Sequence, residues 1–154
     1  MDEREFSERA AALERRLYRV CFALLRCDAD CADAVQEALL KAWRALAWLR
    51  REEYFETWLT RIAINECRRI LRMRRHALEL DARLPAPEPP DVGLRDALMA
   101  LDVQLRLPVV LHYVNGFDIA ETARILHLPQ GTVKSRLYRA RARLRELMSE
   151  EDCI

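Results

Sequence analysis

Apolar residues recur along the N-terminal half of this chain at intervals of three and four, which is the spacing of an amphipathic helix. The first stripe predicts a helix that runs to about Arg26, and it consists of Leu13, Leu17, Val20 and Leu24. Asp28 and Asp30 supply turn and N-cap chemistry for a second helix, whose stripe is Val35, Leu39, Ala42 and Leu46. A third helix is predicted from Glu56 or Thr57 to the basic run at Arg68–His76, with an apolar face of Leu59, Ile62, Ala63 and Ile70.

The C-terminal half shows the same spacing, interrupted by turn residues. It opens with a stripe of Leu94, Leu98, Leu101 and Leu105. We expect Pro108 in the first turn of the next helix, which stops at Asn115–Gly116. Asp118 and Glu121 have the spacing of a capping box and predict the start of a helix through Leu126. After a turn at His127–Gly131, the last helix is expected to bury Val133, Leu137, Ala140, Leu144 and Leu147.

The amino-acid composition, together with this helical spacing, indicates the fold class. The 154 residues are 51% hydrophobic and 33% charged, as in folded proteins. Strong helix formers dominate the long segments and no strand or hairpin pattern occurs, so we predict an all-α fold. Leu80–Gly93 holds four of the six prolines, and residues 76–93 carry one Arg against four acids, which predicts an acidic linker. The predicted organisation is a helical domain at 1–76, a linker at 77–93 and a domain at 94–154 that ends in a helix-turn-helix.

Positive charge is concentrated on the last predicted helix. Seven cations and no acid lie between Thr122 and Arg145, although the whole chain has 26 basic against 25 acidic residues. The cations are Arg124, Lys134, Arg136, Arg139, Arg141, Arg143 and Arg145. This distribution is typical of phosphate-backbone binding, so the helix-turn-helix is expected to bind DNA. The alternative, a merely solvated helix face, is less favoured on a protein that is otherwise neutral.

Other chemistries find little support in the sequence. No apolar run reaches the ~20 residues that span a bilayer, and the polar N-terminus argues against a secretory signal peptide. No nucleophile–base constellation, HExxH motif or Gly-rich phosphate loop occurs, so we expect neither an enzyme nor a cofactor. CxxxC without a second pair is a weak zinc signal, and we expect no metal site. Reduced cytosolic thiols are expected at the five cysteines, Cys21, Cys27, Cys31, Cys67 and Cys153.

Three segments carry a more specific signal. One is LPQGTVKSRLYRARARL in the last helix, one is DAVQEALLKAW at Asp33–Trp43, and one is FETWLTRIAIN at Phe55–Asn65. Together they resemble bacterial RNA polymerase sigma factors of the extracytoplasmic-function (ECF) branch, in the family's order and separated by a linker. The resemblance implies a cytoplasmic transcription initiation factor that binds core polymerase, directs it to specific promoters and assists promoter melting.

The resemblance also implies partners and a docking surface. The partners would be core RNA polymerase through its β′ clamp and β flap, promoter DNA, and an anti-sigma protein. Asp33, Gln36 and Glu37 would form a polar, acidic patch that docks on the β′ subunit. Asp33 could also simply favour the positive N-terminal end of its helix. Gln36 and Glu37 lie past the first turn, where docking explains them better.

Aromatic residues cluster between the second and third predicted helices, with five of the eleven between Trp43 and Trp58. Trp43 and Trp58 are expected in the core. Tyr54 and Phe55 are expected in a loop that, by resemblance, captures a base flipped from the non-template strand, with core packing an equal alternative for each ring. Asn65 matches the family's base-contacting Asn, and the cations implied to hold the DNA backbone are Arg61, Arg68, Arg69 and Arg72.

For the upstream promoter element, the resemblance implies that the last helix enters the major groove. The implied contacts are Lys134, Ser135, Arg136, Tyr138 and Arg139. Gly131 and Thr132 would lie where the helix N-terminus meets a phosphate. Thr122 replaces a usual Ile and His127 a frequent Gly, which predicts weaker packing and backbone strain at these two positions. Arg68-Arg69 occupy a stretch where an acid is common, which leaves the exact base preference open.

Two other classes of protein would explain part of this sequence. The alternative interpretation is a free-standing helix-turn-helix regulator that binds operator DNA without polymerase, usually as a dimer. The docking-like motif at Asp33–Trp43 argues against it, because such a regulator does not need that motif. A pure protein-interaction module would explain the helices but not the two separated basic segments.

Overall fold

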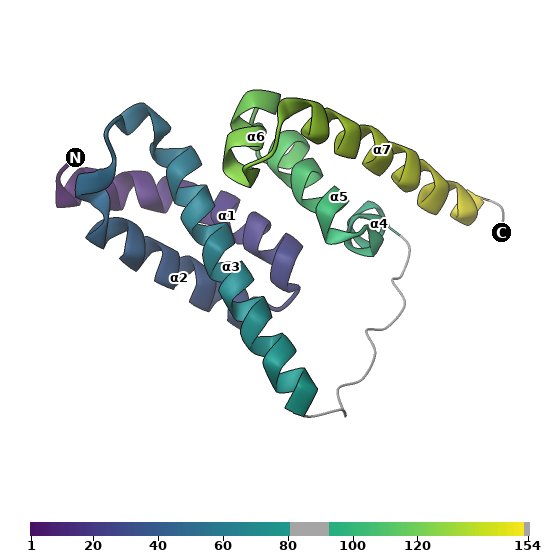
Figure 1. The fold of residues 1–154 in the computed structure, drawn as a ribbon, viewed down its shortest axis with the longest axis horizontal. Coiled ribbons are helices and arrows are strands. Elements are labelled where there is room, and N and C mark those ends of the chain that lie inside the picture. Colours follow the sequence, from purple (N-terminus) through teal and green to yellow (C-terminus); the bar gives the residue numbers. More distant parts are fainter. Residues whose placement is uncertain (81–92, 153–154) are drawn as a thin grey trace. The chain divides into compact units, whose positions relative to one another are not determined.

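The computed structural model describes residues 1–80 and 93–152, and these are helical apart from short connections (Figure 1). The all-α prediction is confirmed. The chain divides into two compact units, Met1–Ala82 and Arg83–Ile154, which we describe separately. Most of the predicted linker at 77–93 lies outside the described residues. Among the described helices, none combines the length and the apolar composition that a membrane span requires.

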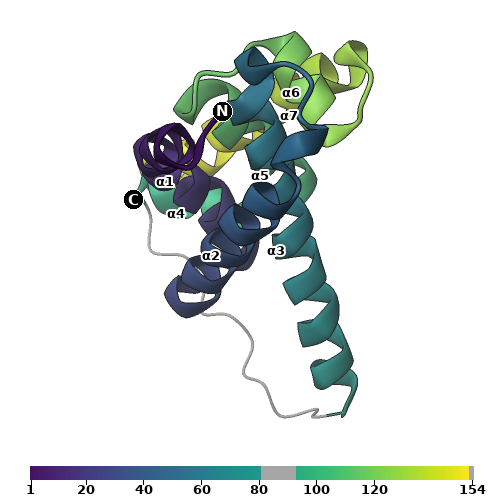
Figure 2. The same ribbon diagram turned by 90° about the vertical axis from the view of Figure 1, so that its left-hand side faces the viewer.

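Unit 1 is a bundle of three helices, α1 (Glu3–Leu25), α2 (Asp28–Arg44) and α3 (Phe55–Leu80), which pack pairwise on one another (Figure 2). Two 3₁₀ turns, η1 (Leu46–Trp48) and η2 (Glu52–Tyr54), connect α2 to α3. Buried members of the predicted apolar stripes include Leu17, Val20, Val35, Ala42, Leu59 and Ala63. Leu46, predicted in the second helix, lies in η1 beyond the end of α2 and is half-buried.

The junction of α1 and α2 differs from the prediction. Arg26 ends α1 in the left-handed conformation at φ 58°, and Cys27 is the N-cap of α2 without a side-chain hydrogen bond. Asp28 and Asp30 lie inside the first turn of α2, so their predicted N-cap role is wrong. Their carboxylates still favour the positive end of the helix, and Asp30 pairs with Arg74 of α3.

Helix α3 runs to Leu80, past its predicted end at His76. The Ala-Leu-Glu-Leu segment that follows His76 consists of good helix formers, which extend the helix before the first proline. Arg74 also donates to the backbone carbonyl of Leu25 at 2.9 Å. One guanidinium therefore ties α3 to the end of α1 and to the start of α2.

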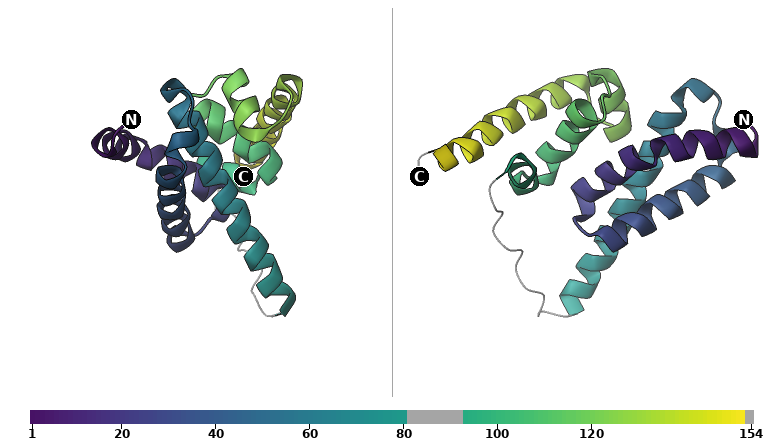
Figure 3. Two further views of the ribbon diagram at one scale, coloured as in Figure 1. Left: turned by 60° about the vertical axis from the view of Figure 1, so that its left-hand side comes forward. Right: turned by 180° about the vertical axis from the view of Figure 1, so that it is seen from behind.

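Unit 2 contains α4 (Leu94–Ala100), α5 (Val103–Val109), a π-helical turn η3 (Val110–Val114), α6 (Ile119–Leu126) and α7 (Gln130–Asp152) (Figure 3). Helix α7 packs against α4, α5 and α6. The buried cluster between them consists of Leu101, Val109, Ala123, Val133, Leu137 and Ala140. The stripe predicted for the last helix is therefore confirmed at its first three positions, while Leu144 and Leu147 are partly buried against the same cluster.

The predicted position of Pro108 is wrong. Helix α5 begins at Val103, and Pro108 lies inside it and is buried. Because proline has no backbone N–H, the preceding turn loses one hydrogen bond. The chain continues in the wider turn η3, where the Asn115 N–H donates to the Val110 carbonyl at 2.9 Å. The stop at Asn115–Gly116 is as predicted, with Gly116 at φ +78°.

The start and the end of α6 agree with the boundaries predicted from the sequence. The Asp118 carboxylate accepts from the Glu121 N–H at 2.7 Å, and the Glu121 carboxylate accepts from the Asp118 N–H at 2.9 Å, so the capping box is confirmed. His127 ends α6 at φ 54°, a left-handed conformation that usually favours glycine. Thr122 is fully buried in this helix, and its hydroxyl oxygen has no hydrogen-bond partner in the structure.

Candidate functional site

One face of α2 carries the predicted polar patch. Asp33 and Gln36 are exposed and Glu37 is half-buried, whereas Ala34 and Ala38 are buried on the opposite side. Residues three and four apart share a helix face, so the three polar side chains form one surface. Leu40 lies on the next turn of the same face and is 42% exposed. The patch can contact a partner without any rearrangement of the bundle.

Phe55 does not lie in a loop, and this prediction is wrong. It is the first residue of α3 and is completely buried. Its ring packs edge-on against Phe6 at 5.6 Å, and the Arg9 guanidinium lies 4.8 Å from the ring centroid. A ring enclosed in this way belongs to the core and cannot stack on a base. Tyr54 lies in η2 and is 39% exposed, with Arg51 5.9 Å from its ring.

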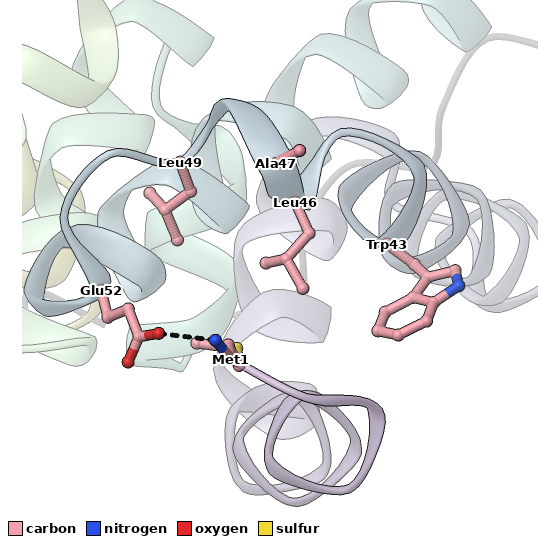
Figure 4. A pocket seen from close by; sticks show the side chains of 6 residues that line it. All are labelled: Met1, Trp43, Leu46, Ala47, Leu49 and Glu52. Atoms are coloured by element: carbon pink, nitrogen blue, oxygen red, sulfur yellow. Dashed lines mark hydrogen bonds and ion pairs between the residues drawn. The ribbon is translucent and has the colours of Figure 1, made fainter.

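Trp43 is also not the core residue that its position predicts. It is 42% exposed and contacts Phe6, with ring centroids 5.2 Å apart. Trp58 is half-buried. Figure 4 shows the Trp43 indole at one side of a pocket of about 400 Å³, whose remaining lining consists of Met1, Leu46, Ala47, Leu49 and Glu52. The Met1 ammonium donates to Glu52 at 2.7 Å, and this hydrogen bond lowers the pKa of the Glu52 carboxyl.

Four of the predicted downstream-element residues form a single stripe along α3. They follow one another at intervals of four, three and four, and they are Arg61, Asn65, Arg68 and Arg72. Asn65, Arg68 and Arg72 are exposed, and Arg61 is half-buried. Among the described residues, Arg68 and Arg72 have no ion-pair partner. The structure thus brings one amide and three guanidinium groups onto one helix face.

Arg69 is turned toward a different partner. Its Nε donates to Glu66 at 3.0 Å and its Nη1 lies 3.2 Å from the Met73 sulfur. Glu66 is only 3% exposed and also accepts from Lys41 of α2. Burial by itself raises the pKa of Glu66, but the hydrogen bonds from Lys41 and Arg69 outweigh it and the pKa is lowered. Arg69 is therefore engaged inside unit 1, apart from the stripe that contains Asn65.

Sequence reasoning missed Glu66 although a signal was present. It lies three and four residues from Ile70, Ile62 and Ala63, so it interrupts an apolar stripe with an acid. Carboxylates in buried positions are nearly always paired. Arg69, which follows Glu66 by three residues, is the cation that this spacing indicates as its partner. The second partner, Lys41, depends on how α2 packs against α3.

The N-terminal half of α7 presents the predicted upstream-element residues. Lys134, Ser135 and Arg139 are exposed, Tyr138 is 68% exposed, and Arg136 is half-buried. These side chains lie opposite the buried stripe that begins at Val133, so the core of unit 2 turns them outward. Gly131 and Thr132 lie in the first turn of α7. Gly131 therefore belongs to the helix and not to the preceding turn.

Arg141, by contrast, is held within the unit. Its Nη1 donates to the Tyr113 hydroxyl at 2.5 Å, which links α7 to η3. Arg143 is paired with Glu146 at 3.0 Å on the helix surface. Arg141 and Arg143 are thus engaged by neighbouring side chains within unit 2.

Three thiols of unit 1 are core residues, whereas Cys27 is half-buried. Cys21, Cys31 and Cys67 come from α1, α2 and α3 and are all fully buried. Burial raises the pKa of Cys31 to about 11. The pKa of Cys67 is also raised, mainly by a hydrogen bond with Cys21 and secondly by burial. Within residues 1–80 and 93–152, no group of three His, Cys, Asp or Glu side chains could hold a metal ion. Cys153 lies outside the described residues.

Comparison with protein families gives two matches. The model for sigma-70 region 2 matches residues 10–77, and the model for sigma-70 region 4 matches residues 92–144. The first match covers the helices that carry the α2 patch and the α3 stripe. The second covers α4 to α6 and most of α7.

Individual proteins agree with these families. The ECF RNA polymerase sigma factor SigM of Mycobacterium tuberculosis is 37% identical over 143 residues, which cover 87% of this chain and 72% of SigM. The sigma factor RpoE from Bartonella quintana, solved in complex with the anti-sigma factor NepR, has a similar structure with a TM-score of 0.82. The two chains are 26% identical, and the match covers 94% of this chain and 97% of RpoE. CnrH, solved in complex with the cytosolic domain of CnrY, is similar with a TM-score of 0.77 and 30% identity over 97% of this chain and 90% of CnrH.

Proposed function

The chain belongs to the ECF family of RNA polymerase sigma factors, and we propose that three surfaces divide its work between core polymerase and promoter DNA. As a member of this family, it is a transcription initiation factor that binds core RNA polymerase, directs it to specific promoters and assists promoter melting. The site of action would be the cytoplasm, where core polymerase and promoters are found.

The α2 patch of Asp33, Gln36 and Glu37 docks on the β′ clamp of core polymerase. Its exposure on one helix face supports this role. Carboxylate and amide groups at such a surface select a basic or polar partner, and Leu40 adds an apolar contact at its edge. Unit 2 contacts the β flap.

The α3 stripe binds the downstream promoter element. Asn65 can read a base edge with its amide, which both donates and accepts hydrogen bonds. Arg61, Arg68 and Arg72 neutralise the phosphates on either side. Arg69 contributes mainly by holding Glu66, since its guanidinium is already engaged there.

The first turns of α7 bind the upstream element in the major groove. The observation that carries this assignment is the alternation of the buried Val133, Leu137 and Ala140 with exposed Lys134 and Arg139. Lys and Arg hydrogen-bond to guanine O6 and N7. The free N–H groups at Gly131 and Thr132 approach a phosphate.

We also expect an anti-sigma protein as a partner. RpoE of Bartonella quintana was solved in complex with the anti-sigma factor NepR. A protein that covers the α2 patch or the α7 surface would compete directly with polymerase or DNA.

The test is reconstitution with purified bacterial core polymerase and a library of promoter fragments. The wild-type chain should bind core and initiate from a defined set of fragments. The triple variant D33A/Q36A/E37A should lose core affinity, whereas Glu14→Ala, an exposed acid on α1, should retain it. If the wild-type chain binds duplex DNA but not core polymerase, the docking assignment fails and the free-standing regulator takes its place.

A further inference from the structure

Tyr113 lies in the turn η3 of unit 2, and none of the surfaces proposed above includes it. Its side chain is 52% exposed. Its hydroxyl oxygen accepts a hydrogen bond from Nη1 of Arg141 at 2.5 Å, which joins two residues that are 28 positions apart in the chain. A guanidinium can only donate, so the phenol oxygen is the acceptor. The contact therefore connects η3 to the helix that carries the predicted upstream-element residues.

The phenol is itself held in place by its neighbours. The His112 ring lies edge-on to the Tyr113 ring, with centroids 4.8 Å apart. His112 Nδ1 lies 2.7 Å from the carbonyl oxygen of the buried Phe117, and a carbonyl only accepts, so this nitrogen carries the proton. The Phe117 N–H donates to the Leu111 carbonyl at 3.0 Å. Tyr113 thus projects from a segment that hydrogen bonds fasten on either side of it.

Arg141 extends the exposed face of α7. Lys134, Tyr138 and Arg141 follow one another at intervals of four and three, so they lie on one helix face. All three are exposed. Because a helix rises about 1.5 Å per residue, Arg141 lies roughly 10 Å further along the helix axis than Lys134. A helix that enters the major groove with its first turns brings such a later position close to the DNA backbone at the edge of the groove.

The hydrogen bond orients Arg141 without neutralising it. The Tyr113 hydroxyl is uncharged, so the guanidinium keeps its positive charge and its other N–H groups. Arg143, by contrast, is paired with the carboxylate of Glu146 at 3.0 Å. A long side chain loses rotamer freedom when it binds a phosphate, and an orienting hydrogen bond removes part of that freedom beforehand. Arg141 is therefore both charged and preorganised for an anion.

We propose that Tyr113 is a positioning residue for promoter binding, whose hydroxyl holds Arg141 toward a phosphate of the upstream element, beyond the residues that enter the major groove. Tyr113 itself does not contact the DNA. This inference rests on the proposed function of α7 and adds a positioning residue to it. Immobilising one long side chain costs affinity about 2- to 10-fold, so loss of the hydroxyl should weaken DNA binding by that factor while the phosphate contact remains.

The test is a double-mutant cycle in complexes with core polymerase, in which the affinity for an upstream-element duplex is measured at several salt concentrations. Tyr113→Phe removes the hydroxyl and keeps the ring against His112. It should lower the affinity about 2- to 10-fold and leave the salt slope at its wild-type value. Arg141→Ala should lower the affinity and reduce the salt slope by about one. In the double variant Y113F/R141A, loss of the hydroxyl should add nothing to loss of the guanidinium.

Arg143→Ala is the matched control, because its cation is already paired with Glu146. Tyr113→Phe should keep its full effect on DNA affinity in that background. The affinity for core polymerase, measured in parallel for each variant, should stay at the wild-type value.

Four outcomes would overturn the inference. An affinity of Tyr113→Phe within about twofold of wild type would show that the hydroxyl does not position Arg141. An equal loss with and without Arg141 would assign Tyr113 to the packing of unit 2. An unchanged salt slope in Arg141→Ala would remove Arg141 from the phosphate contacts. A fall in core affinity that accounts for the whole loss of DNA binding would assign the pair to polymerase.

Repeating the cycle on a duplex of scrambled sequence separates this inference from the proposed function, because a phosphate contact does not depend on sequence. A wild-type holoenzyme that binds both duplexes equally well would contradict the proposed recognition of the upstream element. Coupling between Tyr113 and Arg141 on both duplexes would in that case still support the positioning role, and its absence on both would overturn it.

Discussion

The buried carboxylate of Glu66 gives a quantitative test of how α2 is held against α3. Glu66→Gln keeps the size of the side chain but removes its charge, and its amide has one acceptor oxygen in place of the two that now accept from Lys41 and Arg69. Such charge-assisted hydrogen bonds contribute about 1.5–3 kcal/mol each. Lys41 and Arg69 are 45% and 43% exposed and can rehydrate once released, so the lower end of that range applies. We expect a loss of about 2 kcal/mol in the free energy of unfolding of unit 1.

Tryptophan fluorescence during urea unfolding is the assay, because all three tryptophans lie in unit 1 and report on it alone. A loss of this size corresponds to a decrease of about 8–16 °C in the melting temperature of a domain of this length. Glu14→Gln on the surface of α1 serves as the matched control and should change stability by less than about 0.5 kcal/mol.

The effect should also depend on pH with a defined sign. The folded-state pKa of Glu66 is lowered from its ordinary value of 4.5, so its contribution is present above that value and is lost as the pH falls through the folded pKa. The difference between wild type and Glu66→Gln should therefore be full at pH 7 and shrink in acid. Equal stability at pH 7, or a difference that does not change in acid, would refute the argument that ionised Glu66 stabilises the bundle.

Three further predictions concern unit 2. Thr122→Val should stabilise unit 2 by about 1 kcal/mol, because a methyl group of similar size replaces a buried hydroxyl that has no hydrogen-bond partner. Thermal unfolding followed by circular dichroism should show the higher midpoint. Gly116→Ala should destabilise it by about 1 kcal/mol through the backbone alone, since φ is +78° and no atom lies within 4 Å of the added Cβ; an unchanged denaturation midpoint would contradict this. Arg139→Ala should reduce the slope of log affinity against log salt by about one for upstream-element DNA. Arg143→Ala, whose cation is paired with Glu146, should change this slope less. Equal slopes for the two variants in fluorescence anisotropy titrations would remove Arg139 from the phosphate contacts.

Local pattern predicts much of unit 2 because its decisive features are close in sequence. The capping box of Asp118 and Glu121 needs only two residues at the right spacing. The helical period that buries Val133 and Leu137 also exposes Lys134 and Arg139, so the candidate DNA face follows from the core stripe. The backbone strain expected at His127, where the resembled family often has glycine, agrees with its left-handed conformation at φ 54°.

The features that the sequence did not reveal depend on contacts across helices. Phe55 follows a polar segment and looks exposed, but Phe6 and Arg9 of α1 enclose its ring. Pro108 suits a helix start by its local preference, yet the helix begins at Val103, because the buried residues of α5 pack against α7 and the wider turn η3 accommodates the lost hydrogen bond. In each case the free energy gained by burying the side chain exceeds its local conformational preference, so the tertiary contact decides the structure.

The sequence by itself therefore determined the all-α class, the positions of most helices and the faces that they leave exposed, because helical periodicity and capping are properties of neighbouring residues. Only the tertiary structure decided which aromatic rings are core and which are available, and which cations are already engaged. Burial and ion pairing depend on side chains that are distant in sequence, as Lys41 and Glu66 are. Phe55 ceased to be a candidate for base capture for that reason.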